Sequence, residues 1–160
     1  MNLDITSDWV LLLLRLVLGL TFIYYGWPKI KDLKANAKDF EKKGFYPGVL
    51  WGSLIVGLEF FGGIAVVSGI YAEFFALALM FHMATGTFWK LKMKMPFTNY
   101  SYDIQLFTLA AAVAFFGAGT FSINNFNALP LLRWDLAIGV FAMSAVFAYF
   151  SKPQKDKTDK

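Results

Sequence analysis

The chain contains no cysteine and only one histidine among its 160 residues. Without cysteine it cannot form a disulfide, hold an iron–sulfur cluster through thiolates, attach haem c covalently or relay a persulfide. With one histidine, a single chain cannot supply two histidine ligands to a haem. If the chain takes part in redox chemistry, we therefore expect the electrons to come from another component.

Charged residues are also scarce. They make up 16% of the chain, and hydrophobic residues make up 58%, whereas soluble domains are about a quarter charged and about half apolar. The net charge of +4 comes from segregated lysines, and no nucleic-acid motif accompanies them, so the basic balance suits an anionic membrane surface. The composition predicts an integral membrane protein with a single domain. Its first residues carry Asp4 and Asp8 but no Lys or Arg, which is not typical of a cleavable signal peptide.

Five apolar runs predict an all-α transmembrane helical bundle. They cover residues 9–27, 50–69, 71–89, 103–122 and 133–150, and each is about long enough to cross a bilayer as a helix. Pro28 is expected to break the first helix. Residues 30–43 place apolar side chains on one side and lysines elsewhere, which predicts an amphipathic helix lying in the membrane interface. A charged tail, 151–160, follows the last run.

The tryptophans and lysines agree with five crossings. All five tryptophans lie at the ends of predicted segments, where interfacial aromatic residues belong. Five crossings also bring three lysine-rich groups, at 29–43, 90–94 and 152–160, to one side and leave the other side without lysine. The positive-inside rule then predicts an N-terminus outside and a C-terminus in the cytoplasm.

Three ionisable side chains, those of Arg15, Glu59 and His82, are predicted inside the membrane. A charge in the middle of a span costs about 3 kcal/mol or more on insertion scales, so each needs a partner or access to water. Counted from the outer surface, the three residues lie roughly 9, 15 and 16 Å deep. A long arginine side chain covers that difference. We therefore expect the three side chains to meet near mid-membrane.

Two interpretations of this polar group remain open. In the first, Arg15 and Glu59 form an ion pair that only sets the helix register. In the second, the group binds a ligand or exchanges protons, with Glu59 and His82 as the catalytic candidates. Lys29 is expected to snorkel to the interface. Asp103 is expected to act as a charge at the N-terminus of its helix.

The order and spacing of these residues resemble the DoxX family over roughly residues 11–125. The resemblance is carried by Arg15-Leu-Val-Leu-Gly19, Phe22, Gly26 and Lys29, by Glu59 with Gly62, Gly63 and Gly69, and by Gly117-Ala-Gly119-Thr-Phe-Ser122-Ile. It implies a small prokaryotic inner-membrane protein with a four-helix core, to which segment 133–150 adds a fifth transmembrane helix. The chain departs from the family pattern at Asn124, where the family often has aspartate.

The resemblance also implies an association with membrane oxidoreductase systems. Some DoxX-like proteins are subunits of a thiosulfate:quinone oxidoreductase, and others are thought to assemble with superoxide dismutase and a sulfurtransferase. We therefore expect a subunit or accessory protein of a quinone-linked system. Its expected ligand is a quinone or another lipid-soluble molecule, and no metal ligands are expected. The ligand-binding candidates are Arg15, Gly19, Gly26, Lys29, Glu59, Gly63 and His82.

The expected partners are membrane lipids, including anionic lipid at the cytoplasmic face, and proteins of a redox complex. A homo-oligomer is a further expectation, and nucleic acid is not a partner. Two other functions remain open. One is a non-enzymatic scaffold or assembly factor whose polar core is structural, and the other is a carrier of protons or small solutes. The absence of a recognisable inverted repeat disfavours the carrier.

Overall fold

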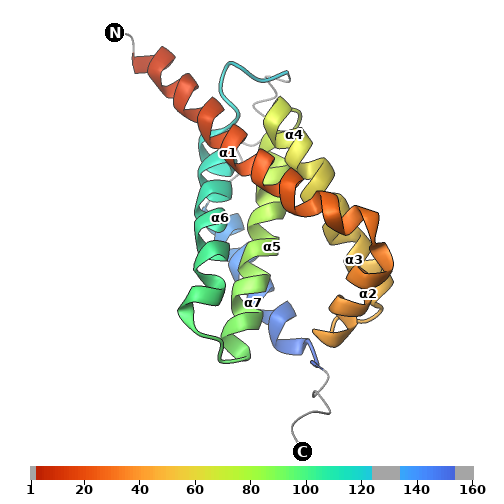
Figure 1. Cartoon of the computed structure of the whole chain (residues 1–160). Coiled ribbons are helices and arrows are strands. Elements are labelled where there is room, and N and C mark those ends of the chain that lie inside the picture. The colour runs from red at the N-terminus through yellow and green to blue at the C-terminus, as the bar shows by residue number, and fades with distance from the viewer. Residues whose placement is uncertain (1–2, 124–133, 154–160) are drawn as a thin grey trace, which may run out of the picture.

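The computed structural model describes residues 3–123 and 134–153, and the side chains of residues 7–123 and 138–153. Asn124, Arg133 and the predicted tail beyond residue 153 lie outside the described residues. Over the described ranges the chain is helical, with short turns and loops and no strand. The helices are α1 (Leu3–Lys31), α2 (Leu33–Lys42), α3 (Gly48–Gly57), the π-helical turn η1 (Leu58–Gly62), α4 (Gly63–Ser68), α5 (Ala72–Lys92), α6 (Phe97–Phe116) and α7 (Trp134–Phe150) (Figure 1).

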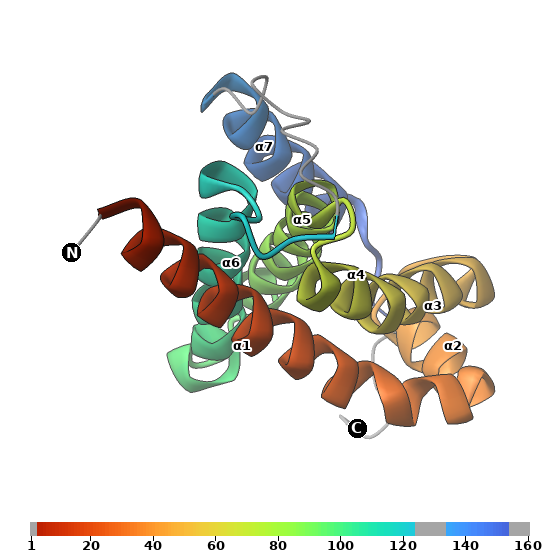
Figure 2. The same cartoon turned by 90° about the horizontal axis from the view of Figure 1, so that it is seen from above.

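Helix α5 is the centre of the bundle. It packs against α6, α7, α4 and η1, while α1 crosses α4 and η1 and also touches α6 (Figures 1 and 2). The core is made of buried apolar side chains from these helices, including Leu18, Phe22, Val66, Leu79, Met80 and Val113. The first turns of α1 and the last turns of α7 lie at opposite ends of the molecule (Figure 1).

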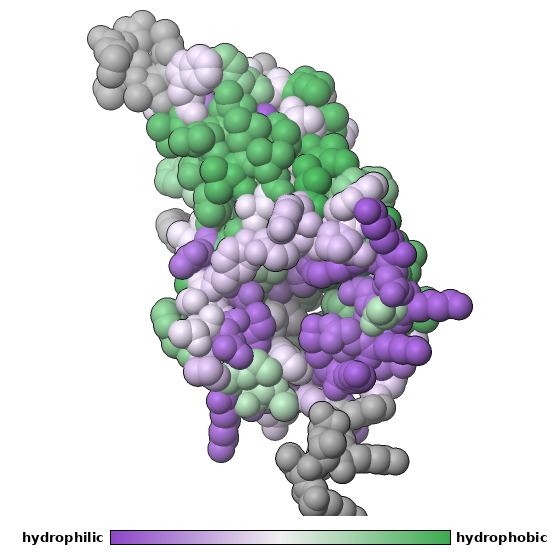
Figure 3. Space-filling view, in the orientation of Figure 1, coloured by the Kyte–Doolittle hydropathy of each residue, from purple (hydrophilic) through white to green (hydrophobic). Residues whose placement is uncertain are grey.

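The face of the molecule seen in Figure 3 is strongly apolar towards one end and polar towards the other. Among the described residues, three helical stretches are long and apolar enough to cross a membrane, namely Ser7–Lys31, Gly48–Ser68 and Ala72–Lys92. Large apolar side chains on these stretches face outward, as with Leu13 and Phe61, which is the arrangement expected of lipid-facing helices. Hydrophilic side chains gather in the lower half of the view in Figure 3. Crossings by α6 and α7 remain a prediction.

The break predicted at Pro28 is wrong. Helix α1 runs on through Pro28 to Lys31, since a proline near the end of a long helix removes only one hydrogen bond from it. The chain turns at Asp32 instead, whose carboxylate accepts the N–H of Ala35 at 2.9 Å and caps α2. Lys29 is therefore part of α1, and its position along that helix is fixed by the same packing that places the rest of α1.

Helix α6 is shifted towards the N-terminus relative to the prediction. It begins at Phe97 instead of Asp103, and it ends at Phe116 instead of Ser122. The helix ends there because Gly117 has a φ of +86°, a conformation that glycine adopts at little cost and that diverts the chain from the helix. The shift puts Asp103 inside α6 and not at its start.

The second predicted segment is a continuous helical rod made of α3, η1 and α4. Its middle turn is a π-helix that contains Glu59; such single π turns occur frequently at functional sites. Helix α2 packs on α3, and the buried Asn36 amide donates to the carbonyl of Gly52 at 2.9 Å. Residues 33–42, within the range predicted as an amphipathic helix, therefore form a helix that is docked against α3. Its position at a membrane interface stays a prediction.

Candidate functional site

A cavity of about 330 Å³ opens at the polar end of the bundle. Figure 3 shows the surface hollowed among hydrophilic side chains in this half of the molecule. All the described helical elements except α4 contribute residues to its lining. Much of the wall is aromatic, with the rings of Phe22, Tyr25, Phe40, Phe45, Trp51, Phe81, Trp89, Tyr102 and Phe147. An apolar cavity with a few convergent polar groups is the usual form of a small-molecule site.

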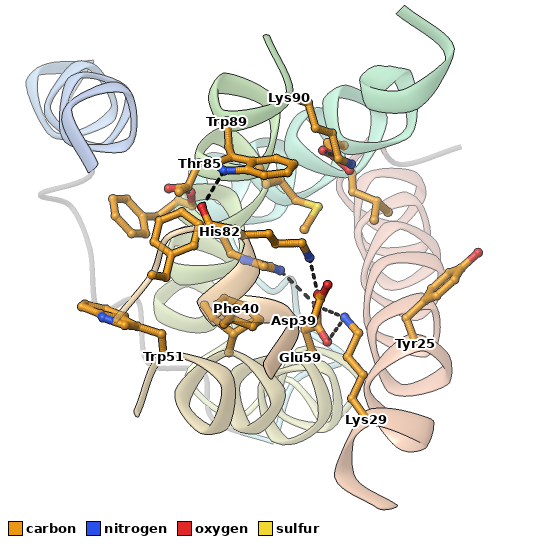
Figure 4. Close-up of a pocket in the computed structure, with 18 of the residues that line it drawn as sticks. Tyr25, Lys29, Asp39, Phe40, Trp51, Glu59, His82, Thr85, Trp89 and Lys90 are labelled. Carbon is orange, nitrogen blue, oxygen red and sulfur yellow. Dashed lines mark hydrogen bonds and ion pairs between the residues drawn. The ribbon is translucent and has the colours of Figure 1, made fainter. Parts of the chain in front are cut away.

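The carboxylate of Glu59 is the polar centre of this cavity (Figure 4). The residue is 3% exposed. Lys29 Nζ lies 2.6 Å from both carboxylate oxygens, and His82 Nε2 lies 3.0 Å from Oε1. A buried carboxylate needs such partners, because an uncompensated charge in a low-dielectric interior is expensive. The three residues come from η1, α1 and α5, so the cluster also joins three elements of the bundle.

Close packing of two helices brings Lys29 to Glu59. A Cβ added to Gly26 would lie 3.0 Å from the backbone nitrogen of Phe60 and 3.2 Å from Glu59 Cβ. A glycine at this position lets α1 approach η1 closely without displacing η1. Lys29 lies three residues further along the same face of α1 and thus reaches the carboxylate. The side chain of Lys29 is 38% exposed, and its predicted position at the membrane interface stays a prediction.

Two more lysine–carboxylate pairs line the same cavity. Lys90 Nζ lies 2.7 Å from Asp103 Oδ2, and Lys43 Nζ lies 2.5 Å from Asp39 Oδ2. Asp103 therefore pairs with a lysine of α5, and the predicted role as an N-terminal helix charge is wrong because α6 begins six residues earlier, at Phe97. With His82 neutral, the ionisable residues in the lining carry no net charge. A cavity lining without net charge favours a neutral ligand over a charged one.

Arg15 lies away from this cavity. It is 1% exposed, and its guanidinium donates to backbone carbonyls: Nε to Val66 and Nη2 to Val67, both at 3.0 Å, Nη2 to Phe121 at 3.2 Å, and Nη1 to Ala118. The predicted meeting of Arg15 with Glu59 and His82 is therefore wrong. These bonds tie α1 to the end of α4 and to the loop after α6.

The glycines explain why Arg15 and Glu59 are separated. Gly19 packs against Gly63, where an added Cβ would lie 2.5 Å from the Gly63 carbonyl oxygen, and Gly26 packs beside Glu59. This antiparallel register brings Arg15 level with the last turn of α4. The predicted depths counted each helix from an assumed membrane surface and could not detect this offset. Gly19, Gly26 and Gly63 thus set the helix approach, and none of the three lines the cavity.

The loop of residues 117–123 is held at the end of the bundle opposite the cavity. Glu73 Oε1 accepts the N–H of Ala118 at 3.0 Å, and the Asp8 carboxylate accepts the N–H and the hydroxyl of Thr120 at 3.0 and 2.6 Å. Together with Arg15, these contacts satisfy the loop's backbone. We interpret this end of the molecule as structural.

The prediction missed the aromatic wall and the Lys90–Asp103 pair. Trp51 and Trp89 look like interfacial residues from their positions at segment ends, and Phe147 looks like a lipid-facing residue of the last segment. Of the residues that line the cavity, Lys29, Glu59 and His82 were among the predicted ligand-binding candidates. The other members come from segments far apart in the chain, and only the folded bundle brings them together.

Apolar helices with outward-facing hydrophobic side chains, enclosing buried polar clusters, define a multi-pass helical membrane protein. The model of the DoxX family matches residues 10–90. The chain belongs to the DoxX family, and the resemblance predicted from its residues is confirmed. The match covers α1 to α5 and includes Lys29, Glu59 and His82, whereas α6 and α7 lie beyond it. No curated protein and no solved structure matches the chain.

Proposed function

We propose that this DoxX protein is a membrane subunit or accessory protein of a quinone-linked redox system, and that its cavity binds the ring of a quinone. The observation that carries the proposal is the buried Glu59 carboxylate, held by Lys29 and His82 in the wall of an aromatic cavity. A quinone ring is flat, neutral and apolar, with two carbonyl oxygens that need hydrogen-bond donors. Aromatic walls and a donor cluster at one side match these requirements.

The chemistry assigned to the site is proton handling. Reduction of a quinone to a quinol takes up two electrons and two protons, and a partner in the redox system supplies the electrons. Lys29 and His82 carry N–H groups that can donate to a quinone oxygen. Glu59 orients both of these groups and, with His82, provides a pair able to pass a proton. Arg15 has no part in this step, because its donors are bound to backbone carbonyls.

Native mass spectrometry tests the proposal on the protein extracted from its own membranes in mild detergent. We expect a bound mass that matches a quinone, and we expect its occupancy to fall about tenfold or more in Glu59→Gln. Glu73→Gln is the matched control, because it makes the same change at another buried carboxylate, in the first turn of α5, which binds the loop of residues 117–123 at the opposite end of the bundle. Both variants should remain folded, as judged by helical circular dichroism.

Three outcomes would contradict the proposal. Equal quinone occupancy in the two glutamine variants would show that the Glu59 cluster is not the site. A stoichiometric partner protein without any bound quinone would instead favour a non-enzymatic assembly factor. Proton leak or solute uptake in liposomes that contain only this chain would favour the carrier function.

A further inference from the structure

Helix α7 contributes one aromatic ring to the cavity, that of Phe147. Of the described residues of α7, Phe147 is the one that lines the cavity. Its ring is stacked on Phe45, with centroids 5.3 Å apart and planes 18° apart, and it meets Trp51 edge-on at 4.7 Å. Phe81 of α5 lies 6.3 Å away. Phe147 therefore stands in the wall between rings that belong to the loop after α2, to α3 and to α5.

The end of α7 is held in place by contacts that do not involve the cavity. Lys92 Nζ donates to the carbonyls of Tyr149 and Ser151, at 2.7 and 2.5 Å, and so caps the C-terminus of α7. Lys152 N–H donates to the carbonyl of Gly44 at 3.3 Å. A side chain at Gly44 would meet the Lys152 backbone, with an added Cβ 2.2 Å from its carbonyl carbon. These contacts position Phe147 before any ligand is present.

We propose that Phe147 is a specificity-determining residue of the cavity, which limits the size of the ring system that the cavity admits. The inference rests on the proposed function, because it assumes that the occupant is a quinone. The backbone that follows Phe147 is held by these hydrogen bonds, and its ring packs on three other rings, so the ring cannot easily move aside for a larger ligand. Truncating it removes one wall and leaves the contacts of the Glu59 cluster in place, because Lys29 and His82 bind Glu59 directly and the ring of Phe147 packs on Phe45, Trp51 and Phe81. A substitution of Phe147 should therefore change which ring sizes the cavity prefers without changing proton transfer at Glu59.

The test measures the binding of three quinones with one, two and three fused rings, namely duroquinone, menadione and 2-methylanthraquinone. The full chain is studied in nanodiscs by native mass spectrometry. We expect Phe147→Ala to raise the affinity for the three-ring quinone relative to the one-ring quinone by about tenfold. We expect Phe147→Trp to shift the ratio in the opposite direction. Phe141→Ala is the matched control, since Phe141 also lies on α7 but packs against Phe88 and Phe107 outside the cavity lining.

Each result leads to a different conclusion. A ratio that moves equally in Phe147→Ala and Phe141→Ala, or in neither, overturns the role of Phe147 while leaving the quinone site in place. A wild-type chain that binds none of the three quinones overturns the proposed function, and the inference falls with it. If Phe147→Ala does not fold, Phe147→Leu and Phe147→Trp decide the question, because both keep an apolar side chain in the wall.

Discussion

Lys29 and Arg15 lie on the same face of α1, yet the chain uses their positive charges in different ways. All three guanidinium nitrogens of Arg15 donate to carbonyl oxygens, and its planar fork of donors suits several acceptors at once. Lys29 is a compact charge whose Nζ contacts both oxygens of a single carboxylate. We interpret the hydrogen bonds of Arg15 to backbone carbonyls as structural. The cluster of Lys29 faces a cavity and includes a histidine, so it is the one that can do chemistry.

Replacing Arg15 by glutamine should destabilise the protein strongly. The change leaves buried carbonyl oxygens of the last turn of α4 and of the loop after α6 without donors, which we expect to cost about 3 kcal/mol. The thermal unfolding of the detergent-solubilised protein measures this loss. Lys38→Gln removes a charge from an exposed position of α2 and should leave the unfolding temperature unchanged. A quinone affinity that survives in the folded fraction of Arg15→Gln would agree with a structural role, whereas equal stability of the two variants would refute it.

A double-mutant cycle should reveal strong coupling between Lys29 and Glu59. We expect Lys29→Met and Glu59→Leu each to destabilise by about 3 kcal/mol, because each leaves an uncompensated charge. The double variant should be far more stable than the sum of the two changes implies, with a coupling of about 2 kcal/mol. The Lys43–Asp39 pair, at spacing i,i+4 and more exposed, serves as the control and should give about 0.5 kcal/mol or less. Similar coupling in both pairs would contradict the burial argument.

At the scale of the element, the rod formed by α3, η1 and α4 has two structural roles. Its glycine-rich end in α4 lets α1 approach closely, and its π turn holds Glu59 at the cavity. Helix α1 is the matching partner, with Gly19 and Gly26 at the two points of contact. The register of these two elements separates the structural end of the molecule from the cavity end. A change at either glycine should therefore disturb helix packing before it disturbs chemistry.

The substitution Gly19→Ala should destabilise the protein, while Gly57→Ala should not. A Cβ at Gly19 would lie 2.5 Å from the Gly63 carbonyl oxygen, but one at Gly57 would meet nothing within 4 Å. Both residues lie in helices, so alanine gains the same helix propensity of about 1 kcal/mol at each. Thermal unfolding of the two variants isolates the steric cost. Equal unfolding temperatures would show that α1 and α4 can shift apart without penalty.

At the scale of the whole molecule, the lysine-rich segments gather at one end. The turn at Gly44, the lysines of α5 and the segment after α7 are joined there by direct contacts, Lys152 to Gly44 and Lys92 to Ser151. The start of α1 lies at the other end (Figure 1). The five crossings and the orientation predicted from the lysines stay predictions.

Single cysteines introduced into this cysteine-free chain can test that orientation. We expect Asn2→Cys to react with a membrane-impermeant maleimide added outside intact cells, and Thr158→Cys to react only after the cells are opened. The unmodified chain gives the background, because it has no thiol to label. Labelling of both positions from the same side would show an even number of crossings and would contradict the five-helix topology.

The sequence alone was enough to identify the membrane class, the family and most of the helices. Long apolar stretches such as those of α1 and α5 predict membrane-spanning helices, and this prediction needs only the residues of the stretch itself. The ionisable residues inside the bundle, Glu59 and His82, were also identifiable, because a charge within an apolar run is costly wherever it points. Helix ends were less predictable, as Pro28 and Gly117 show, since each depends on how the following residues pack.

Only the tertiary structure decided which charges meet. The contacts of Gly19 with Gly63 and of Gly26 with Glu59 set the offset between α1 and the α3–η1–α4 rod. Because of that offset, Lys29 pairs with Glu59, and Arg15 donates to backbone carbonyls of α4. Depth estimated from each segment separately cannot contain such an offset, because helix register is a property of the contact between two helices. The cavity depends in the same way on rings from distant segments, including Phe147 of α7.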